Sequence, residues 1–225
     1  LLDQTAFAKL LVRGPDAEAA LQYLCANDMA VAPGTTVYTG ILNDRGGYES
    51  DVTVTRTAED EYLLVTGSAQ ATRDEHYLNK HLPAGLRVEI VDVTSSYAVL
   101  GIMGPQSRTL LSRLTGSDLG NEAFPFYTSQ LLDVGPVPVR ATRVSYVGDL
   151  GWELYIPTEY AVTAYESLVG AGEDLGLALV GHYAVDAMRI EKGYRAWGRE
   201  LTPDRTPVEA GMTFTCKLAS GVDFR

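Results

Sequence analysis

The chain has few cysteines and no long apolar run. Its two cysteines, Cys25 and Cys216, are too few for a disulfide framework, so a reduced, intracellular state is the simpler expectation. No apolar stretch approaches the roughly 18–20 residues that a membrane span needs. Neither a signal peptide nor a basic amphipathic leader is visible. We therefore expect a cytoplasmic protein that does not contact a membrane.

Basic residues are also scarce. The 225 residues include 18 Lys and Arg against 29 Asp and Glu, which gives a formal net charge of −11. Nucleic-acid binding requires several Lys or Arg side chains that neutralise phosphates, so this charge argues against it. An anionic small molecule would need a local basic cluster, and the densest one consists of Arg189, Lys192, Arg195 and Arg199. This cluster either holds an anionic tail or pairs with surface acids such as Glu191 and Glu200.

The common catalytic and cofactor signatures are missing. No CxxC, HExxH, GxSxG or GxGxxG sequence occurs. The three histidines, His76, His81 and His182, lack the spacing of metal ligands. We expect no metal site, and no flavin or nicotinamide site within this chain.

The most informative feature that is present is an internal repeat. Residues 7–24 (FAKLLVRGPDAEAALQYL) align without gaps with residues 97–114 (YAVLGIMGPQSRTLLSRL). Gly14 and Gly104 occupy the same place in the two copies. Each copy is typical of a short strand, a Gly-Pro turn and an amphipathic helix. A duplicated unit is therefore predicted, with a seam between the copies where a ligand can bind.

The two halves predict the same order of elements. In the first half we expect strands at 7–13, 36–43, 48–56, 60–66 and 86–92, and helices at 15–28 and 69–82. In the second half we expect strands at 97–103, 137–147 and 152–157, and helices at 105–115 and 159–173. A strand-helix-strand-strand-helix-strand order is the ferredoxin-like plan. The sequence thus predicts an α+β fold of two duplicated ferredoxin-like halves, covering residues 1–94 and 95–225.

Several smaller features carry expectations of their own. Ser68 and Thr158 are plausible N-caps of the helices that follow them. Residues 180–200 are typical of a helix that gives way to a loop after Gly193, and residues 211–218 alternate weakly like a strand.

Asp51 is a local inconsistency inside a strand pattern. Residues 48–55 alternate with a period of two, which places Val52 and Val54 on one face and Asp51 and Thr53 on the other. Aspartate is a poor strand former, so its presence needs a reason. Either this face is solvated or Asp51 has a function.

Glu153 lies close to aromatic residues. Tyr146 and Glu153 flank the turn at 148–151, and Trp152 precedes Glu153. A carboxylate beside an aromatic ring suits a flat heterocycle, because it accepts two parallel hydrogen bonds from an amidine-like edge. The alternative is an exposed hairpin on which the glutamate is incidental.

A family resemblance rests on three segments taken in order. YTGILNDRGG (38–47) with DVTV (51–54), then YVGDLGWEL (146–154), then RIEKGYRAWG (189–198), resemble the glycine-cleavage T-protein (aminomethyltransferase) family. The closest similarity is to the folate-binding portion of dimethylglycine and sarcosine dehydrogenases and oxidases. The resemblance implies a domain that binds tetrahydrofolate between duplicated halves. Relatives continue into a C-terminal barrel, and the dehydrogenases also carry a flavin half, so we expect this chain to be a fragment without either.

The resemblance also implies roles for individual residues. Asp51 matches the catalytic aspartate near the folate nitrogens that capture the one-carbon unit. Glu153 matches the glutamate that binds the amino and ring N–H groups of the pterin. The other implied cofactor-binding residues are Tyr38 and Tyr146 at the pterin, Arg189 towards the glutamate tail of the cofactor, and Trp197.

The implied reaction is a one-carbon transfer to tetrahydrofolate. An iminium or formaldehyde-level carbon from a methylated glycine would be captured as 5,10-methylenetetrahydrofolate, so the expected partners are folate, a methylated amine donor and a flavin-dependent oxidative domain. T-proteins usually have Asn where this chain has residues 66–68 (TGS), as the dehydrogenase branch does, which argues against transfer from a lipoyl-bound group. Two alternatives stay open: a folate-binding scaffold or sensor without transferase activity, and a demethylase that yields 5-methyltetrahydrofolate.

Overall fold

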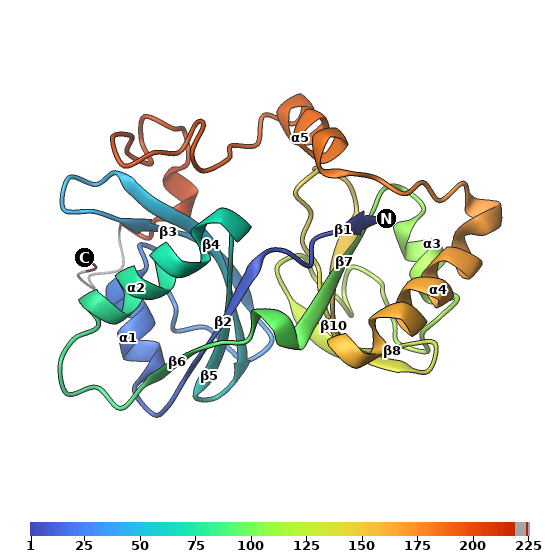
Figure 1. Ribbon diagram of the computed structural model, residues 1–225, viewed down its shortest axis with the longest axis horizontal. Helices are drawn as coiled ribbons and strands as arrows, with labels where there is room; N and C mark the ends of the chain where they lie inside the picture. Colours follow the sequence, from blue (N-terminus) through green and yellow to red (C-terminus); the bar gives the residue numbers. More distant parts are fainter. Residues whose placement is uncertain (219–223, 225) are drawn as a thin grey trace. The chain divides into compact units, whose positions relative to one another are not determined.

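Two antiparallel five-stranded sheets organise the chain in the computed structural model, which describes residues 1–218 and 224 (Figure 1). One compact unit, here the Asp51 unit, comprises residues 7–94 and 195–225. The other, the Glu153 unit, comprises residues 1–6 and 95–194. The chain passes from one unit to the other at 94/95, and the division of a folate-binding domain into residues 1–94 and 95–225 stays a prediction. Residues 1–6 and the stretch from Arg195 onward, however, each belong to the unit formed by the other half.

The Asp51 unit has the strand order β3-β4-β5-β2-β6. Its strands are β2 (Ala8–Arg13), β3 (Thr36–Leu42), β4 (Tyr48–Ala58), β5 (Glu61–Thr66) and β6 (Glu89–Asp92), and its helices are α1 (Ala17–Leu24) and α2 (Ala71–His81). Alternate strand residues and one face of each helix are apolar, as sheet and helix periodicity require. The core contains Leu10, Val12, Val52, Val54 and Leu64 from the strands and Leu21, Leu24 and Leu78 from the helices.

The Glu153 unit has the strand order β1-β7-β10-β9-β8. Its strands are β1 (Leu2–Asp3), β7 (Tyr97–Met103), β8 (Ser129–Val134), β9 (Val137–Thr142) and β10 (Gly151–Pro157), and its helices are α3 (Ser107–Ser112), α4 (Ala161–Gly172) and α5 (His182–Glu191). Its core contains Ile102, Trp152, Leu154 and Ile156 from the strands and Leu110, Leu111, Ala164 and Leu168 from the helices. The predicted α+β class with two duplicated, mostly antiparallel halves is confirmed. In each unit three strands lie between the first two helices, one more than the ferredoxin-like plan has.

The repeat seen in the sequence is a repeat of backbone conformation. Gly14 and Gly104 have φ values of 131° and 129°. Their amides donate to carbonyls ninety residues apart, Asp60 O at 2.9 Å and Leu150 O at 2.8 Å. Each half also buries a pair of hydroxyls between equivalent strands, and these pairs are Thr36 with Thr55 at 2.9 Å and Ser129 with Thr142 at 3.0 Å.

The repeat provides a matched pair of substitutions. Gly14→Ala and Gly104→Ala each force a side chain into a backbone region that glycine adopts freely, at a cost of about 1–3 kcal/mol. At Gly14 the new Cβ would also overlap the carbonyl oxygen of Arg87, whereas at Gly104 nothing lies within 4 Å. We expect Gly14→Ala to lower the free energy of unfolding more than Gly104→Ala, in urea denaturation. Equal losses would contradict this reading of the two turns.

The start of the chain completes the sheet of the Glu153 unit. In the Asp51 unit β6 pairs with the edge of β2, and in the Glu153 unit β1 takes the corresponding place beside β7. Leu2 pairs with Gly101 and Asp3 with Leu100. These bonds explain why residues 1–6 belong to the Glu153 unit.

Both predicted helix caps are wrong. Ser68 and Thr158 each begin a 3₁₀ turn, Ser68–Gln70 and Thr158–Tyr160, and the α-helices start after these turns without a side-chain cap. The Thr158 hydroxyl donates instead to Ser95 O at 2.7 Å.

Other predictions met mixed outcomes. The helix expected after residue 180 is α5, and a turn follows it. The strand expected at 137–147 ends at Thr142, and residues 211–218 hold a 3₁₀ turn, Thr213–Thr215, in place of the expected strand. Both the amide and the hydroxyl of Thr215 donate to Met212 O in this turn, at 3.0 and 2.8 Å. Within the described part of the chain, no helix is long and apolar enough to cross a membrane.

Candidate functional site

Asp51 lies on the face of its sheet that is opposite helices α1 and α2. Val52 and Val54 belong to the core beneath the helices, so the alternation of β4 places Asp51 on the other face. Its register partner on β3 is Gly40. A Cβ at Gly40 would lie 2.8 Å from the ring of Tyr48, so the glycine makes room for this ring near the carboxylate.

A tyrosine hydroxyl holds the Asp51 carboxylate. The Tyr38 hydroxyl donates to Asp51 Oδ2 at 2.7 Å, and the Tyr48 hydroxyl is 2.8 Å from Thr215 Oγ1. Burial raises the pKa of Asp51, the bond from Tyr38 opposes this shift, and the nearby carboxylate of Asp74 adds to it. A carboxylate with a raised pKa is a better proton acceptor near neutral pH. Of the predicted site residues, the structure thus brings Tyr38 and Asp51 into direct contact.

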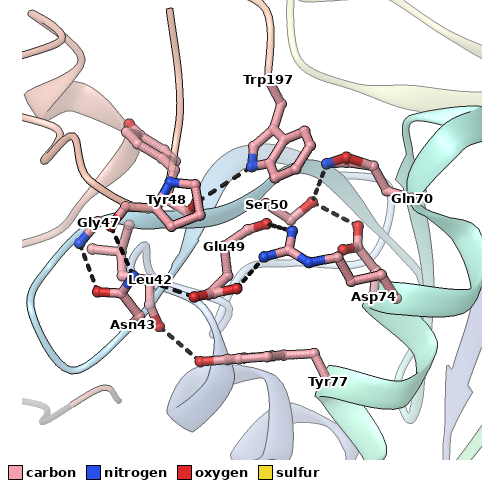
Figure 2. Close-up of polar contacts among 12 residues, drawn as sticks. Leu42, Asn43, Gly47, Tyr48, Glu49, Ser50, Gln70, Asp74, Tyr77 and Trp197 are labelled. Atoms are coloured by element: carbon pink, nitrogen blue, oxygen red, sulfur yellow. Dashed lines mark hydrogen bonds and ion pairs between the residues drawn. The ribbon is translucent and has the colours of Figure 1, made fainter. Parts of the chain in front are cut away.

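A buried polar network connects α2 to β4 and β5, and Figure 2 shows the part of it formed by Ser50, Gln70 and Asp74. Asp74, on α2, is almost completely buried and accepts bonds from Ser50 Oγ at 2.6 Å and Thr66 Oγ1 at 2.5 Å. Burial raises the pKa of Asp74, and the two hydroxyl bonds oppose this shift. Because Ser50 precedes Asp51, the network fixes the part of β4 that carries the predicted catalytic residue.

Trp197 contacts the same strand from the segment that follows Arg195. Its indole N–H donates to Tyr48 O at 3.3 Å (Figure 2). The guanidinium of Arg73 lies 4.8 Å from the centroid of the Trp197 ring and forms an ion pair with Glu49. The indole N–H of Trp197 therefore bonds to β4, and its ring packs against Arg73 on α2. Its predicted contact with the cofactor stays a prediction.

Glu153 occupies a comparable face of the other sheet. Trp152 and Leu154 point into the core beneath α3 and α4, so Glu153 and Tyr155 lie on the opposite face of β10. The Tyr155 hydroxyl donates to Glu153 Oε2 at 2.8 Å, and Gln4 Nε2 donates to Oε1 at 3.1 Å. Burial raises the pKa of Glu153, and both bonds oppose this shift. Each carboxylate oxygen has one donor and retains a further lone pair for a ligand.

Tyr146 and Arg189 lie near Tyr194 in the Glu153 unit. The rings of Tyr146 and Tyr194 have centroids 6.4 Å apart. Arg189, on α5, is buried; its Nε donates to Asp186 Oδ1 at 2.8 Å and its Nη1 donates to Tyr194 O at 2.9 Å. The predicted roles of Tyr146 and Arg189 towards the cofactor stay predictions.

The basic cluster takes part in ion pairs within the protein. Arg189 pairs with Asp186, and Lys192 pairs with Asp149 at 3.3 Å. One of the two alternatives, pairing with acids, therefore occurs for Arg189 and Lys192, with acids other than Glu191 and Glu200, and the binding of an anionic tail stays untested.

The sequence interpretation missed two residues that contact Glu153. Tyr155 stands two positions after Glu153 on one strand, so period-two alternation contained the signal. Gln4 is 149 residues away in the sequence. No local pattern pointed to it.

Comparison with known proteins decides the family. The GCVT N-terminal domain family matches residues 1–220. The chain belongs to this family. The predicted resemblance to T-proteins is thereby confirmed, and the two carboxylates described above lie in a GCVT domain.

Relatives of this GCVT domain include two proteins named as mitochondrial dehydrogenases. The chain is 41% identical to human sarcosine dehydrogenase, mitochondrial, over 238 residues, and 37% identical to dimethylglycine dehydrogenase, mitochondrial, of Mus musculus over 225 residues. Each match includes 100% of this chain and 26% of the relative. The chain thus spans about a quarter of the length of these relatives.

A solved structure has the same fold. The crystal structure of glycine cleavage system aminomethyltransferase T from Bartonella henselae superposes with a TM-score of 0.83 at 29% identity. The match covers 96% of this chain and 57% of that protein.

Three carboxyls with a raised pKa in this GCVT domain predict that the free energy of unfolding depends on pH. Burial raises the pKa of Asp51, Asp74 and Glu153. The folded protein then holds these protons more tightly than the unfolded chain, whose carboxyls titrate near pH 4. These groups therefore lower the free energy of unfolding as the pH rises above about 4. Asp16 and Asp28 have a lowered pKa and have the opposite effect. They raise the free energy of unfolding as the pH rises towards about 4.

We expect the free energy of unfolding to depend less steeply on pH in Glu153→Gln, because the variant lacks one titrating group. Urea denaturation of the parent and the variant at pH 5, 6 and 7 measures this dependence. Equal slopes in both proteins would show that the Glu153 pKa is the same in the folded and unfolded states.

Proposed function

We propose that this GCVT domain binds tetrahydrofolate and transfers a one-carbon unit to it. In detail, it captures an iminium or formaldehyde-level carbon from a methylated glycine as 5,10-methylenetetrahydrofolate. The observation that carries the proposal is the half-buried Asp51 carboxylate, held by the Tyr38 hydroxyl on a sheet face opposite the helices. The relatives named sarcosine and dimethylglycine dehydrogenase support the choice of a methylated glycine as carbon source.

Glu153 fits the recognition of a reduced pterin. The 2-amino group and the neighbouring ring N–H of a pterin form a flat edge of two donors, and a carboxylate accepts two parallel bonds from such an edge. Tyr155 and Gln4 hold the Glu153 carboxylate and leave one acceptor site on each oxygen. In this proposal Glu153 determines the orientation of the pterin, and Tyr38, Tyr146 and Arg189 keep their predicted roles as cofactor-binding residues.

Asp51 fits the chemical step. When tetrahydrofolate is bound, the carbon loses the amine of the iminium, or the oxygen of formaldehyde as water, and becomes bonded to the two folate nitrogens. Positive charge develops there, and an ionised carboxylate a few ångström away contributes several kcal/mol in a site shielded from water. The raised pKa of Asp51 also lets it accept the proton that the second nitrogen releases.

A formaldehyde-capture assay tests the proposal. The chain is incubated with formaldehyde and tetrahydrofolate, and the loss of free formaldehyde is followed above the rate without protein. We expect a protein-dependent acceleration with 5,10-methylenetetrahydrofolate as product. Folate binding without acceleration would favour the scaffold or sensor alternative, and 5-methyltetrahydrofolate formed from a methylated donor would favour the demethylase.

The partners belong to the proposal as well. We propose that a flavin-dependent oxidative domain supplies the oxidised amine, since the dehydrogenase relatives are about four times as long as this chain. Both of these relatives are mitochondrial by name, so the expected cytoplasmic location stays a prediction.

A further inference from the structure

Gln4 is a polar residue at the beginning of the chain that reaches Glu153. We propose that Gln4 is a positioning residue, which orients the Glu153 carboxylate for recognition of the pterin edge. The inference rests on the proposed function of Glu153 and adds a residue to it.

The N-terminal strand places Gln4 for this contact. Leu2 and Asp3 pair with β7, and the Gln4 amide continues the pairing by donating to Val99 O at 2.9 Å. Because β7 lies between β1 and β10, the Gln4 side chain has to cross β7 to reach Glu153. It crosses at Gly101, the register partner of Glu153.

Gly101 is the residue that permits the crossing. A Cβ at this position would overlap Gln4 Oε1. In the other half of the duplication the positions equivalent to Gly101 and Glu153 are Leu11 and Leu63, which are register partners on β2 and β5. The first half thus has an apolar Leu–Leu pair. At the same place the second half has a Gly–Glu pair, and the side chain of Gln4 contacts both of its members.

Stability alone does not explain why the Glu153 unit has a Gly–Glu pair at the position of the Leu–Leu pair. An apolar cross-strand pair gains from burial, whereas a buried carboxylate and amide lose hydration and need hydrogen-bond partners. Gln4 is only 8% exposed, and its Oε1 has no hydrogen-bond donor among the described residues. A buried acceptor beside a carboxylate acceptor suits a ligand that carries several N–H groups.

The bond from Gln4 controls how the carboxylate faces a ligand. Tyr155 alone fixes one oxygen and leaves the carboxyl group free to rotate about its last bond. With Gln4 Nε2 on Oε1 as well, both oxygens are held. A ligand then meets a carboxylate that is already oriented, which lowers the entropy lost on binding.

The other charged groups near this face need to be considered in any titration. Among the described residues, Tyr155 is a titratable group in direct contact with Glu153. The register partner of Tyr155 on β9 is Arg140. Helix α5 packs through Val185 near Leu2 and carries Asp186 and Arg189. None of these groups is altered by substitution of Gln4.

A double-mutant cycle tests whether Gln4 acts through Glu153. The variants are Gln4→Met, which keeps the length and removes the donor, Glu153→Gln, and the double variant. In calorimetric titrations with tetrahydrofolate, we expect Gln4→Met to weaken binding about tenfold in the parent. In the Glu153→Gln background we expect it to have little further effect, because the group that it orients has changed. An equal loss in both backgrounds, or no loss in the parent, would overturn the proposal.

Gln70 offers a matched control. It is 5% exposed, its Nε2 lies 3.5 Å from Ser50 Oγ, and its Oε1 also has no donor among the described residues. Gln70→Met therefore removes a buried amide that belongs to the Asp51 unit, whereas Glu153 belongs to the other unit. We expect it to reduce stability without weakening tetrahydrofolate binding. A similar loss of binding in this variant would assign the effect of Gln4→Met to general destabilisation.

A readout without folate separates this inference from the proposed function. The Glu153 carboxyl can be titrated by carbon-13 NMR in the parent and in Gln4→Met. Loss of the donor destabilises the ionised form, so we expect a higher pKa in the variant. An unchanged pKa would overturn the role of Gln4 even if folate binds. Failure of the parent to bind tetrahydrofolate, with the pKa still shifted, would overturn the proposed function and leave the Gln4–Glu153 contact supported.

Discussion

Asp51→Asn is expected to reduce the rate of one-carbon transfer by about 10²–10³-fold, a loss typical of removing one preorganised electrostatic group. Asparagine has the shape of aspartate and can still accept the Tyr38 bond, but it has no charge and cannot accept a proton. The affinity for tetrahydrofolate should remain close to that of the parent, because Glu153 is proposed to provide recognition. The formaldehyde-capture assay measures the rate, and calorimetry measures the affinity.

Asp133→Asn is the matched control for this variant. Asp133 is an exposed strand aspartate on β8, and the account gives it no role in the site. We expect it to retain the parent rate. If Asp51→Asn also transferred the carbon at the parent rate, Asp51 would not be the catalytic residue.

Glu153→Ala is expected to weaken tetrahydrofolate binding by about 1.5–3 kcal/mol, the range for hydrogen bonds to a charged group. The loss corresponds to roughly a 10- to 150-fold increase in the dissociation constant. At saturating folate the transfer rate should fall much less than in the Asp51 variant. This contrast assigns binding to one carboxylate and chemistry to the other.

Glu61→Ala is the control for loss of a strand glutamate. Glu61 is half-buried on β5 and accepts a bond from the Thr57 hydroxyl at 2.7 Å, much as Glu153 accepts one from Tyr155. It should retain the parent affinity. An affinity of Glu153→Ala equal to that of the parent would remove Glu153 from the binding site.

The sequence predicted the parts of the fold that local patterns determine. The strand at 97–103 matches β7, and the duplication was visible because Gly14 and Gly104 require the same unusual backbone conformation. Strand β8 was missed, and β1 is only two residues long and forms through pairing with β7. The helix caps were wrong because a 3₁₀ turn separates each expected cap from its α-helix.

The candidate site shows the same limit. Asp51 was identified because an aspartate conflicts with a strand pattern, and the structure adds the Tyr38 bond that alternation along a single strand does not reveal. Gln4 could not be found from local sequence, because its role depends on the pairing of β1 with the distant strand β7 and on a glycine that makes room for its side chain. Long-range side-chain contacts of this kind depend on the tertiary fold, whereas sequence motifs are visible without knowledge of the fold.

Titration of tetrahydrofolate into the 225-residue chain and its two carboxylate variants is the most direct test of the account. The account predicts saturable binding to one site per chain, with nearly unchanged affinity in Asp51→Asn and clearly reduced affinity in Glu153→Ala. No saturable binding by the parent, or the same affinity in all three proteins, would contradict it.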